Sequence, residues 1–328
     1  MPDEIPMQDM FEVSGPSTDG LCKCTFMAFN TVVWMSAYPD SERPDTEKVL
    51  VSFERARNAC RAYERLFSRT LPNSDITILN SACGKWVDVD PRTHELLRDS
   101  LFYCAQSEGL FDITIGSASR LWDFHTGKIP DPTELEVAME HVDWRKIALD
   151  PEGPPVKGEQ CRARLSDPEA SVDLGGIAKG YIADRLVELM LDCGIGSFVI
   201  NLGGNVVARG RKPDGSKWTV GVQDPANREK LKGAIELEDA SAVTSGIYER
   251  CFVRDGIMYH HILHPKTGMP VRTDLAGVTL VAQRSIDAEG FSTSVLAMGM
   301  HRGMEFAASR PEIEGAILIG VDGRVLEA

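Results

Sequence analysis

Residues Asp173–Tyr181 form the stretch of this sequence whose residue types best suit chemistry on a charged ligand. A short strand is expected to end at Asp173, two glycines follow, and a helix is expected to begin near Ile177. Glycines let the backbone approach a ligand closely, and a helix start offers free N–H groups and a positive dipole end. The stretch predicts a cradle for a phosphate or diphosphate, within reach of Lys179. A tight turn without a ligand is the alternative, and neither a Walker A nor a G-x-G-x-x-G pattern is present.

A second chemical element is the segment Asp287–Thr293. If this segment is helical, Glu289 and Thr293 are four residues apart and share one face. A carboxylate beside a hydroxyl supplies the hard oxygen ligands that Mg²⁺ prefers, and phosphate oxygens could complete the shell. For Glu289 alone, a solvated helix start is the simpler interpretation.

Three further segments place small polar groups or histidines beside glycine: residues 201–205, 244–250 and 260–270. The first is weak evidence alone, because Asn and Gly dominate ordinary turns. Neighbouring residues on a strand point to opposite faces, so only one of His260 and His261 is expected to face a site. The ligand count and spacing do not match a zinc site.

Composition limits the classes of function. The 328-residue chain has a formal net charge of -14, which argues against nucleic acid as the main partner. No apolar run is long enough for a membrane span, and the acidic N-terminus does not match a secretory signal or a lipid-attachment segment. The eight cysteines include no C-x-x-C pair and are expected to be reduced thiols. A cytoplasmic location is therefore expected.

Hydrophobic spacing predicts the elements that position these residues. Apolar residues three to four positions apart predict a helix over 45–67 with one buried face, formed by Val49, Phe53, Ala56, Cys60, Tyr63 and Phe67. Other helices are expected over 93–107, 132–141, 177–191 and 287–299. Strands are expected at 24–37, 171–174, 197–201, 206–210, 218–222, 234–237, 258–263, 278–282, 316–319 and 324–326, and a loop or hairpin insertion at 151–168. Strands and helices mix without strict β-α-β alternation, which predicts an α+β fold.

The order of the motifs and the residues within them closely resemble those of the ApbE family of flavin transferases. The resemblance runs from about Phe26 to Ala297, and its most specific stretches are 109–116 with Leu121-Trp122, 173–181, 201–205, 244–250 and 261–270. It implies mixed helices and antiparallel sheets of the ApbE-like, T-fold-related type. We expect a single domain over residues 21–328, with two closely packed subdomains as the alternative, and a disordered segment over residues 1–20.

Family members bind FAD with Mg²⁺ and transfer FMN to a Thr or Ser hydroxyl of an acceptor protein, releasing AMP. Others hydrolyse FAD to FMN and AMP. The resemblance implies FAD contacts at Phe29, Thr70, Leu110, Phe111, Asp112, Asp173, Lys179, Ile262 and Leu263. It implies metal ligands at Glu289 and Thr293, with Ser292 beside them and the backbone carbonyl of Gly176. His261, as general base or in positioning the nucleophile, and Asp173 are the implied catalytic residues.

The chain departs from the family pattern at several of these positions. Phe29 replaces the usual Met, Thr70 replaces a Tyr, and Glu289 replaces an Asp, with Asp287 as a possible substitute ligand out of register. His264-Pro265 stands where the family has Asp-Pro. FMN transfer to a protein, FAD hydrolysis and FAD binding without catalysis therefore stay open as alternatives.

Overall fold

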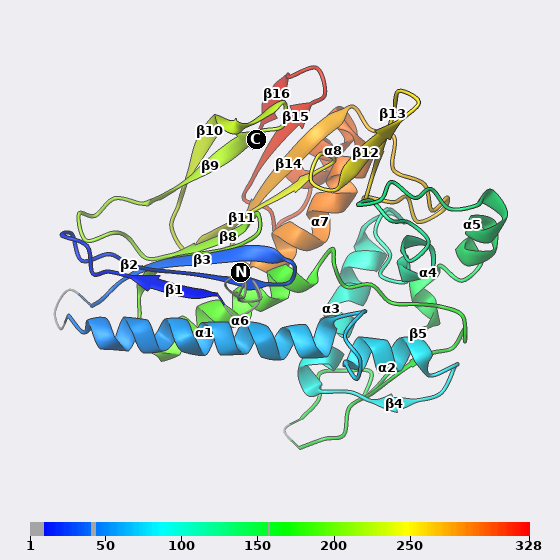
Figure 1. Ribbon diagram of the computed structural model, residues 1–328, viewed down its shortest axis with the longest axis horizontal. Helices are drawn as coiled ribbons and strands as arrows, with labels where there is room; N and C mark the ends of the chain where they lie inside the picture. The colour runs from blue at the N-terminus through cyan, green and yellow to red at the C-terminus, as the bar shows by residue number, and fades with distance from the viewer. Residues whose placement is uncertain (1–9, 41–43, 157) are drawn as a thin grey trace, which may run out of the picture.

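A nine-stranded antiparallel sheet joins the two ends of the chain (Figure 1). The computed structural model describes residues 10–40, 44–156 and 158–328. In spatial order the strands are β1 (Phe11–Ser14), β2 (Cys22–Ala28), β3 (Thr31–Tyr38), β7 (Ser197–Leu202), β8 (Asn205–Arg209), β11 (Ala240–Gly246), β14 (Leu275–Ala282), β15 (Gly315–Gly320) and β16 (Val325–Glu327). Every neighbouring pair is antiparallel. The α+β class expected from the sequence is confirmed.

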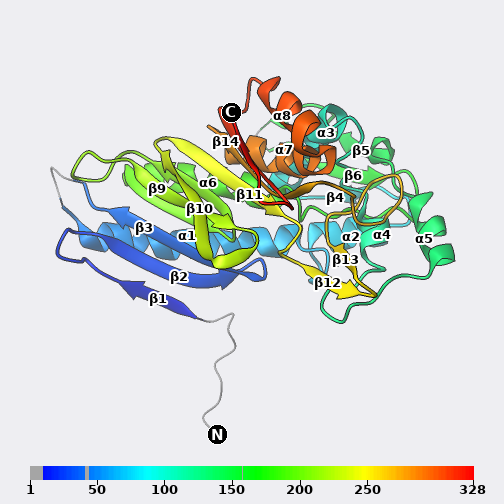
Figure 2. The same cartoon turned by 90° about the horizontal axis from the view of Figure 1, so that it is seen from above.

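The two faces of this sheet are covered differently. Helices α1 (Thr46–Phe67), α6 (Ala178–Asp192), α7 (Ser285–Met298) and α8 (Met300–Ala308) pack on one face and bury the main core. The long hairpin of β9 (Trp218–Asp224) and β10 (Asn227–Leu237) covers the other face, where Trp218 and Leu237 pack on residues of β3, β7, β8 and β11 (Figure 2). The sheet is thus buried on both sides along much of its width.

The remaining elements gather at one end of the molecule (Figures 1 and 2). They are a three-stranded sheet of β4 (Val87–Asp88), β6 (Arg162–Leu165) and β5 (Ile147–Asp150), with α2 (Asp75–Ser81), α3 (Pro91–Gln106), α4 (Gly116–Ser119), α5 (Pro132–Met139) and the hairpin of β12 (Cys251–Arg254) and β13 (Ile257–His260). The loops of this end carry most of the residues expected to do chemistry.

The helices agree well with the periodic patterns. Helix α1 begins after the side-chain cap of Asp45, and its buried face contains all six apolar residues expected there. Helix α5 is capped by Asp131 as expected, and α6 ends before Gly194, which has a φ of 69°. No helix within the described residues is long and apolar enough to cross a membrane.

Several strand predictions are wrong. The segment 24–37 is a hairpin and not one strand, because Phe29 and Asn30 both adopt positive φ and form a tight turn. Residues 171–174 form only one isolated bridge, from Ser171 to Ile115, because this stretch runs as a loop toward α6. Strand β13 ends at His260 and so covers only the first half of the strand expected at 258–263.

Two segments for which no separate strand is expected contribute strands. Residues 1–9 lie outside the described residues, but Phe11–Ser14 form β1, paired with β2, although residues 1–20 were expected to be disordered. At 151–168, where a loop or a hairpin insertion is expected, a hairpin forms: β6 pairs with β5 and also with β4. Each of β1 and β6 thus pairs with a strand close to it in the chain, and β6 also pairs with a distant one.

Candidate functional site

The carboxylate of Asp173 is held by groups from three separate segments. The Asp173 backbone N–H donates to the carbonyl of Ile113 at 2.7 Å. One carboxylate oxygen, Oδ1, accepts from the backbone N–H of Gly175 at 2.9 Å. The other, Oδ2, accepts from the hydroxyl of Ser119 at 3.1 Å and lies 3.3 Å from Nε of Arg69. Asp173 therefore organises the glycine turn that precedes α6.

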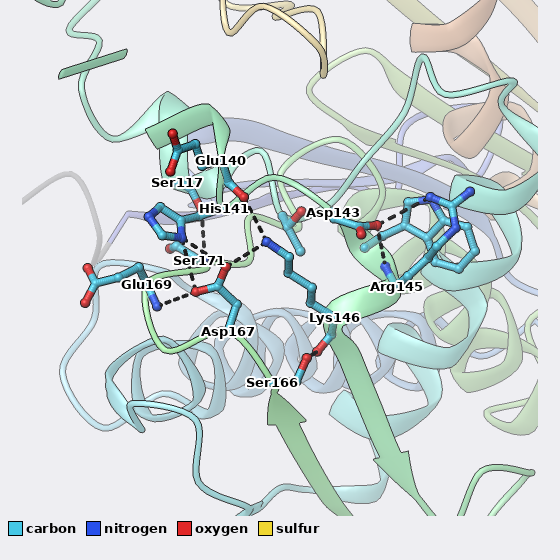
Figure 3. A network of polar contacts seen from close by, with 12 residues as sticks. Ser117, Glu140, His141, Asp143, Arg145, Lys146, Ser166, Asp167, Glu169 and Ser171 are labelled. Atoms are coloured by element: carbon cyan, nitrogen blue, oxygen red, sulfur yellow. Dashed lines mark hydrogen bonds and ion pairs between the residues drawn. The ribbon is translucent and has the colours of Figure 1, made fainter. Parts of the chain in front are cut away.

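A second polar network fixes the loop that leads to Asp173 (Figure 3). Asp167 accepts from Nζ of Lys146 at 2.7 Å and from the backbone N–H of Glu169 at 2.9 Å, and its Oδ2 lies 2.9 Å from Nδ1 of His141. Burial alone would raise the pKa of Asp167, but the hydrogen bonds from Lys146 and His141 hold it well below its usual range. The carboxylate stays ionised and keeps the loop attached to the segment after α5.

Helices α6 and α7 cross closely beside this turn. A Cβ atom on Gly180 would lie 2.7 Å from Cα of Ile286 and 3.0 Å from Cβ of Glu289, so only glycine allows this approach. The crossing brings the ammonium of Lys179 against Oε1 of Glu289, where the two form an ion pair. The start of α6 and the carboxylate on α7 are thus brought together, as the sequence predicts.

Glu289 is almost completely buried, with 4% of its surface exposed. Its second oxygen, Oε2, accepts from Nδ2 of Asn205 at 3.1 Å. One turn along α7, Ser292 shares a 2.8 Å hydrogen bond with the hydroxyl of Ser245, and half-buried Thr293 follows. Glu289 therefore faces the start of α6, and Ser292, one turn further along α7, faces β11.

These oxygens fit a hard divalent cation by their chemistry. Among the described residues, no group of three or more His, Cys, Asp or Glu side chains could hold a metal ion. A cation at this place would depend on Glu289, on hydroxyls and on backbone carbonyls such as that of Gly176. Because Lys179 already pairs with Glu289, a bound cation would share that carboxylate with the ammonium or displace it.

Asp287 does not substitute for Glu289. Its Oδ1 accepts from the hydroxyl of Tyr103 on α3 at 2.5 Å, and Arg284 lies 3.9 Å away. A Cβ on Gly290 would meet the same tyrosine ring. Asp287 therefore faces α3, whereas Glu289 faces Lys179 on α6.

His261 lies directly after β13, and its backbone N–H donates to the carbonyl of Arg250 at 3.0 Å. Nδ1 of its ring is buried and has no hydrogen-bond partner within the described residues. Burial lowers the pKa of His261 to about 4, with smaller contributions from the charges of Arg250 and Lys179. The imidazole is neutral at pH 7 and can accept a proton. By contrast, Nε2 of His260 lies 3.2 Å from the carbonyl of Val271.

The residues expected to contact FAD fall into three groups. The first group lies beside the glycine turn. A Cβ atom placed on Gly176 would be 3.2 Å from the Phe111 ring, and Leu110 is the residue before Phe111. The Asp112 carboxylate, however, is occupied by its own chain, accepting from Thr114 at 2.6 Å and from the backbone N–H of Trp144 at 3.1 Å. Burial raises the pKa of Asp112. In this structure its carboxylate shapes the loop.

The second group lies at the C-terminal end of α1. The Phe29 backbone N–H donates to Oε1 of Glu64 at 3.0 Å, and Thr70 lies in the loop that follows the helix. The third group is Ile262 and Leu263, which follow His261 and are both buried. The Ile262 carbonyl already accepts from the N–H of Val271 at 3.0 Å.

A cavity of about 620 Å³ lies beside Gly109 and Asp112. Asp112, Trp144, Lys146 and Lys266 are among the residues that line it, and none of Asp173, Lys179 or Glu289 does so. The residues at the start of α6 and this cavity are therefore separate features.

The structure adds residues that sequence reasoning missed. Arg69 and Ser119 both contact Asp173, and Asn205 contacts Glu289. Asn205 belongs to a glycine turn that the sequence marked without assigning it a role. Nothing local distinguishes Arg69, because its position depends on how the loop after α1 folds against the start of α6.

Comparison with known proteins places this geometry in a family. A model of the ApbE family matches residues 29–317. The chain belongs to the ApbE family. It is 34% identical to an FAD:protein FMN transferase of Treponema pallidum, over 87% of this chain and 81% of that one. It is 31% identical to an FAD:protein FMN transferase of Klebsiella pneumoniae, over 77% and 78% of the two chains. Membership makes the chain an enzyme of the transferase class.

Solved structures of the ApbE family share the fold. The ApbE protein of Thermotoga maritima superposes with a TM-score of 0.82 at 25% identity, covering 97% of both chains. The flavinyl transferase ApbE of Pseudomonas stutzeri gives a TM-score of 0.78 at 23% identity, over 97% and 94%. The ApbE fold expected from the sequence motifs is confirmed.

Proposed function

We propose that this chain transfers FMN from FAD to a Thr or Ser hydroxyl of an acceptor protein, releases AMP, and requires Mg²⁺. The observation that carries the proposal is the contact of Lys179 with Glu289 beside the Asp173 turn. It gathers a glycine-rich helix start, an ammonium and a buried carboxylate at one point. Such a site suits a diphosphate, whose negative charge must be offset while a P–O bond breaks. Residues 21–328 would act as one transferase domain.

The residues of the chain would divide the work in three parts. The glycine turn and the first N–H groups of α6 would bind the diphosphate, with Lys179 and Arg69 adding positive charge. Neutral His261 would accept the proton of the acceptor hydroxyl as its oxygen attacks the FMN-side phosphorus. AMP would leave with the other phosphate. Asp173 would orient the turn through Gly175 and Ser119.

Glu289, Thr293, Ser292 and the Gly176 carbonyl are the residues that would hold Mg²⁺. When bound, the ion would supply positive charge against the phosphate oxygens. We expect Glu289→Gln and Thr293→Val each to raise the Mg²⁺ concentration for half-maximal AMP release by about tenfold, with partial recovery in excess Mg²⁺. Glu305→Ala, an exposed carboxylate on α8, is the matched control. An unchanged Mg²⁺ dependence in both site variants would remove them from the metal site.

One assay tests the proposed reaction against its alternatives. The purified chain is incubated with FAD and Mg²⁺, with and without Thr-containing acceptor peptides, and AMP and covalently bound FMN are measured. FMN on the peptide supports transfer. AMP with no labelled peptide would support FAD hydrolysis, and tight binding of FAD without AMP would support a carrier protein.

A further inference from the structure

The hairpin β12–β13 forms a small sheet of its own at the end of the molecule that carries α4 and α5 (Figures 1 and 2). Its turn, Asp255-Gly256, has φ values of 52° and 74°, the pattern of a two-residue turn that matches the twist of the strands. Within the described residues this sheet contains only its two strands. A two-stranded hairpin is marginally stable alone, so contacts on one face must hold it.

One face of the hairpin supplies those contacts. Phe252 and Tyr259 stack at 5.3 Å between ring centroids, and they pack against Phe124 and Trp122 at 6.1 and 6.0 Å. Trp122 is fixed in turn, because its indole N–H donates to the carbonyl of Gly268 at 3.0 Å. The hairpin is therefore anchored to the loop between α4 and α5.

The other face is apolar and open. Val253 and Met258 form a cross-strand pair on this face, with 65% and 46% of their surfaces exposed. Ile257, at the tip, lies on the face of Tyr259 and is 56% exposed. We name Val253, Ile257 and Met258 the hairpin patch. Side chains of this kind are normally covered on a stable hairpin, and grouped exposure of apolar residues is typical of interaction surfaces.

The base of the hairpin is part of the candidate site. The N–H of His261 donates to the carbonyl of Arg250, so the ladder of the hairpin continues to the histidine. A segment that docked along the hairpin would therefore be led toward His261.

The charges around the patch indicate the sign of such a segment. Arg250, Arg254 and Lys128 are exposed and form no ion pair within the described part of the chain. Arg254 lies over the Phe252 ring, and Lys128 follows Gly127, which approaches that same ring. Three carboxylates lie nearby: Glu249 is paired with Arg228, Asp123 accepts the backbone N–H groups of His125 and Thr126, and Asp255 forms the turn. In a chain of net charge -14, this is a locally basic border.

We propose that the hairpin patch is the docking surface for the acceptor protein, which binds as an extended segment with apolar and acidic side chains. Such a segment could add to the open edge of the hairpin by backbone hydrogen bonds, with its apolar side chains on Val253 and Met258. Its carboxylates would face Arg254 and Lys128, and its hydroxyl would reach His261. This inference rests on the proposed function, since it names the partner of that site.

The test uses synthetic peptides about 12 residues long, each with one central Thr. One flank alternates Val with Asp, a second Val with Lys, and a third Ser with Gly. Covalent FMN on each peptide is measured with FAD and Mg²⁺, and AMP release is measured without peptide. The parent chain should label the Val/Asp peptide with a kcat/KM about tenfold above that of the others.

Two variant pairs locate the effect. Val253→Ser with Met258→Ser, and Lys128→Glu with Arg254→Glu, should each lower kcat/KM for the Val/Asp peptide by about tenfold. AMP release without peptide and the thermal midpoint should not change. Leu231→Ser and Lys230→Glu on β10 are the controls, since Leu231 is likewise 65% exposed, Lys230 is an exposed lysine, and both belong to the separate β9–β10 sheet.

The outcomes separate the two proposals. Equal labelling of the three peptides, or equal losses in the β10 controls, would overturn the docking surface and leave FMN transfer standing. AMP release with no labelled peptide would also overturn the docking surface. Neither AMP nor labelled peptide from the parent chain would overturn the proposed function and the docking surface with it.

Discussion

At the residue scale, the fold keeps His261 in the neutral form. Burial lowers its pKa to about 4, and the positive charges of Arg250 and Lys179 act in the same direction. A general base works in its unprotonated form, so activity through His261 should be present above that pKa and be lost as the pH falls through about 4. We predict that His261 stays unprotonated between pH 6 and 8, so that its titration does not change the rate of AMP release over this range.

The matching variant is His261→Ala, which should lower AMP release about 10²–10⁴-fold, the usual contribution of a general base. His125→Ala, an exposed histidine in the loop after Trp122, is the control. Should His261→Ala keep the parent rate across this pH range, the imidazole has no part in proton transfer.

The glutamate at position 289 has a side chain one methylene group longer than that of an aspartate. The longer side chain bridges Lys179 on α6 and Asn205 on β8 from within a buried environment. An Asp at this position would have a shorter reach. Glu289 therefore takes part in an ion pair and a hydrogen bond and is not an isolated carboxylate.

At the element scale, the crossing of α6 and α7 depends on Gly180. In Gly180→Ala the new Cβ would lie 2.7 Å from Cα of Ile286 and 2.8 Å from the carbonyl oxygen of Ser285, so the helices must separate. We predict a loss of about 1–3 kcal/mol in the free energy of unfolding, measured by urea denaturation, together with weaker FAD binding. Gly196→Ala, where a Cβ would meet nothing within 4 Å, should change neither. Equal stability of the two variants would show that the crossing tolerates a methyl group.

The start of α7 is capped from α6 by Asp184. Its two carboxylate oxygens accept the backbone N–H groups of Ser285 at 2.7 Å and Ile286 at 3.1 Å. Burial nevertheless raises the pKa of Asp184 to about 6, because desolvation outweighs these two hydrogen bonds. Between pH 4 and 6 the folded chain therefore binds more protons at this group than the unfolded chain.

Stability contributed by Asp184 should accordingly fall as the pH rises from about 4 to about 6, by about 1–3 kcal/mol. Asp184→Asn removes the titration, so its free energy of unfolding should vary less over that range, as urea denaturation at several pH values can measure. If the parent chain and the variant show the same slope, Asp184 does not titrate in this window. Asp167 has the opposite sign: its depressed pKa gives stability that is lost only at lower pH.

At the scale of the whole molecule, the nine-stranded sheet joins residues 11 to 327, and its strands lie side by side in the order in which they occur along the chain. Strand β3 of the N-terminal part pairs directly with β7, and β11 pairs with both β8 and β14. We predict that urea unfolding followed by tryptophan fluorescence and by far-UV circular dichroism gives one coincident transition. Two separated transitions would favour the alternative of two packed subdomains.

Local patterns in the sequence were enough for most helices. Helix α1 follows from apolar spacing and from Asp45, because both act within a few residues of each other. The hairpin turn at Phe29-Asn30 was missed, since positive φ at a phenylalanine has no local signal. Strand β6 and the bridge at Ser171 also depend on partners far away in the chain.

The sequence by itself determined the α+β class, the helix starts and the motifs around Asp173, His261 and Glu289, because these depend on neighbouring residues. Only the tertiary structure decided that Lys179 pairs with Glu289, that Arg69 reaches Asp173, and that the carboxylate of Asp112 is used by its own loop. The physical reason is the same in each case. A side chain pairs with whatever the packing of helices and loops brings within about 3 Å, and that distance is set by contacts such as the one at Gly180, which link residues more than a hundred positions apart.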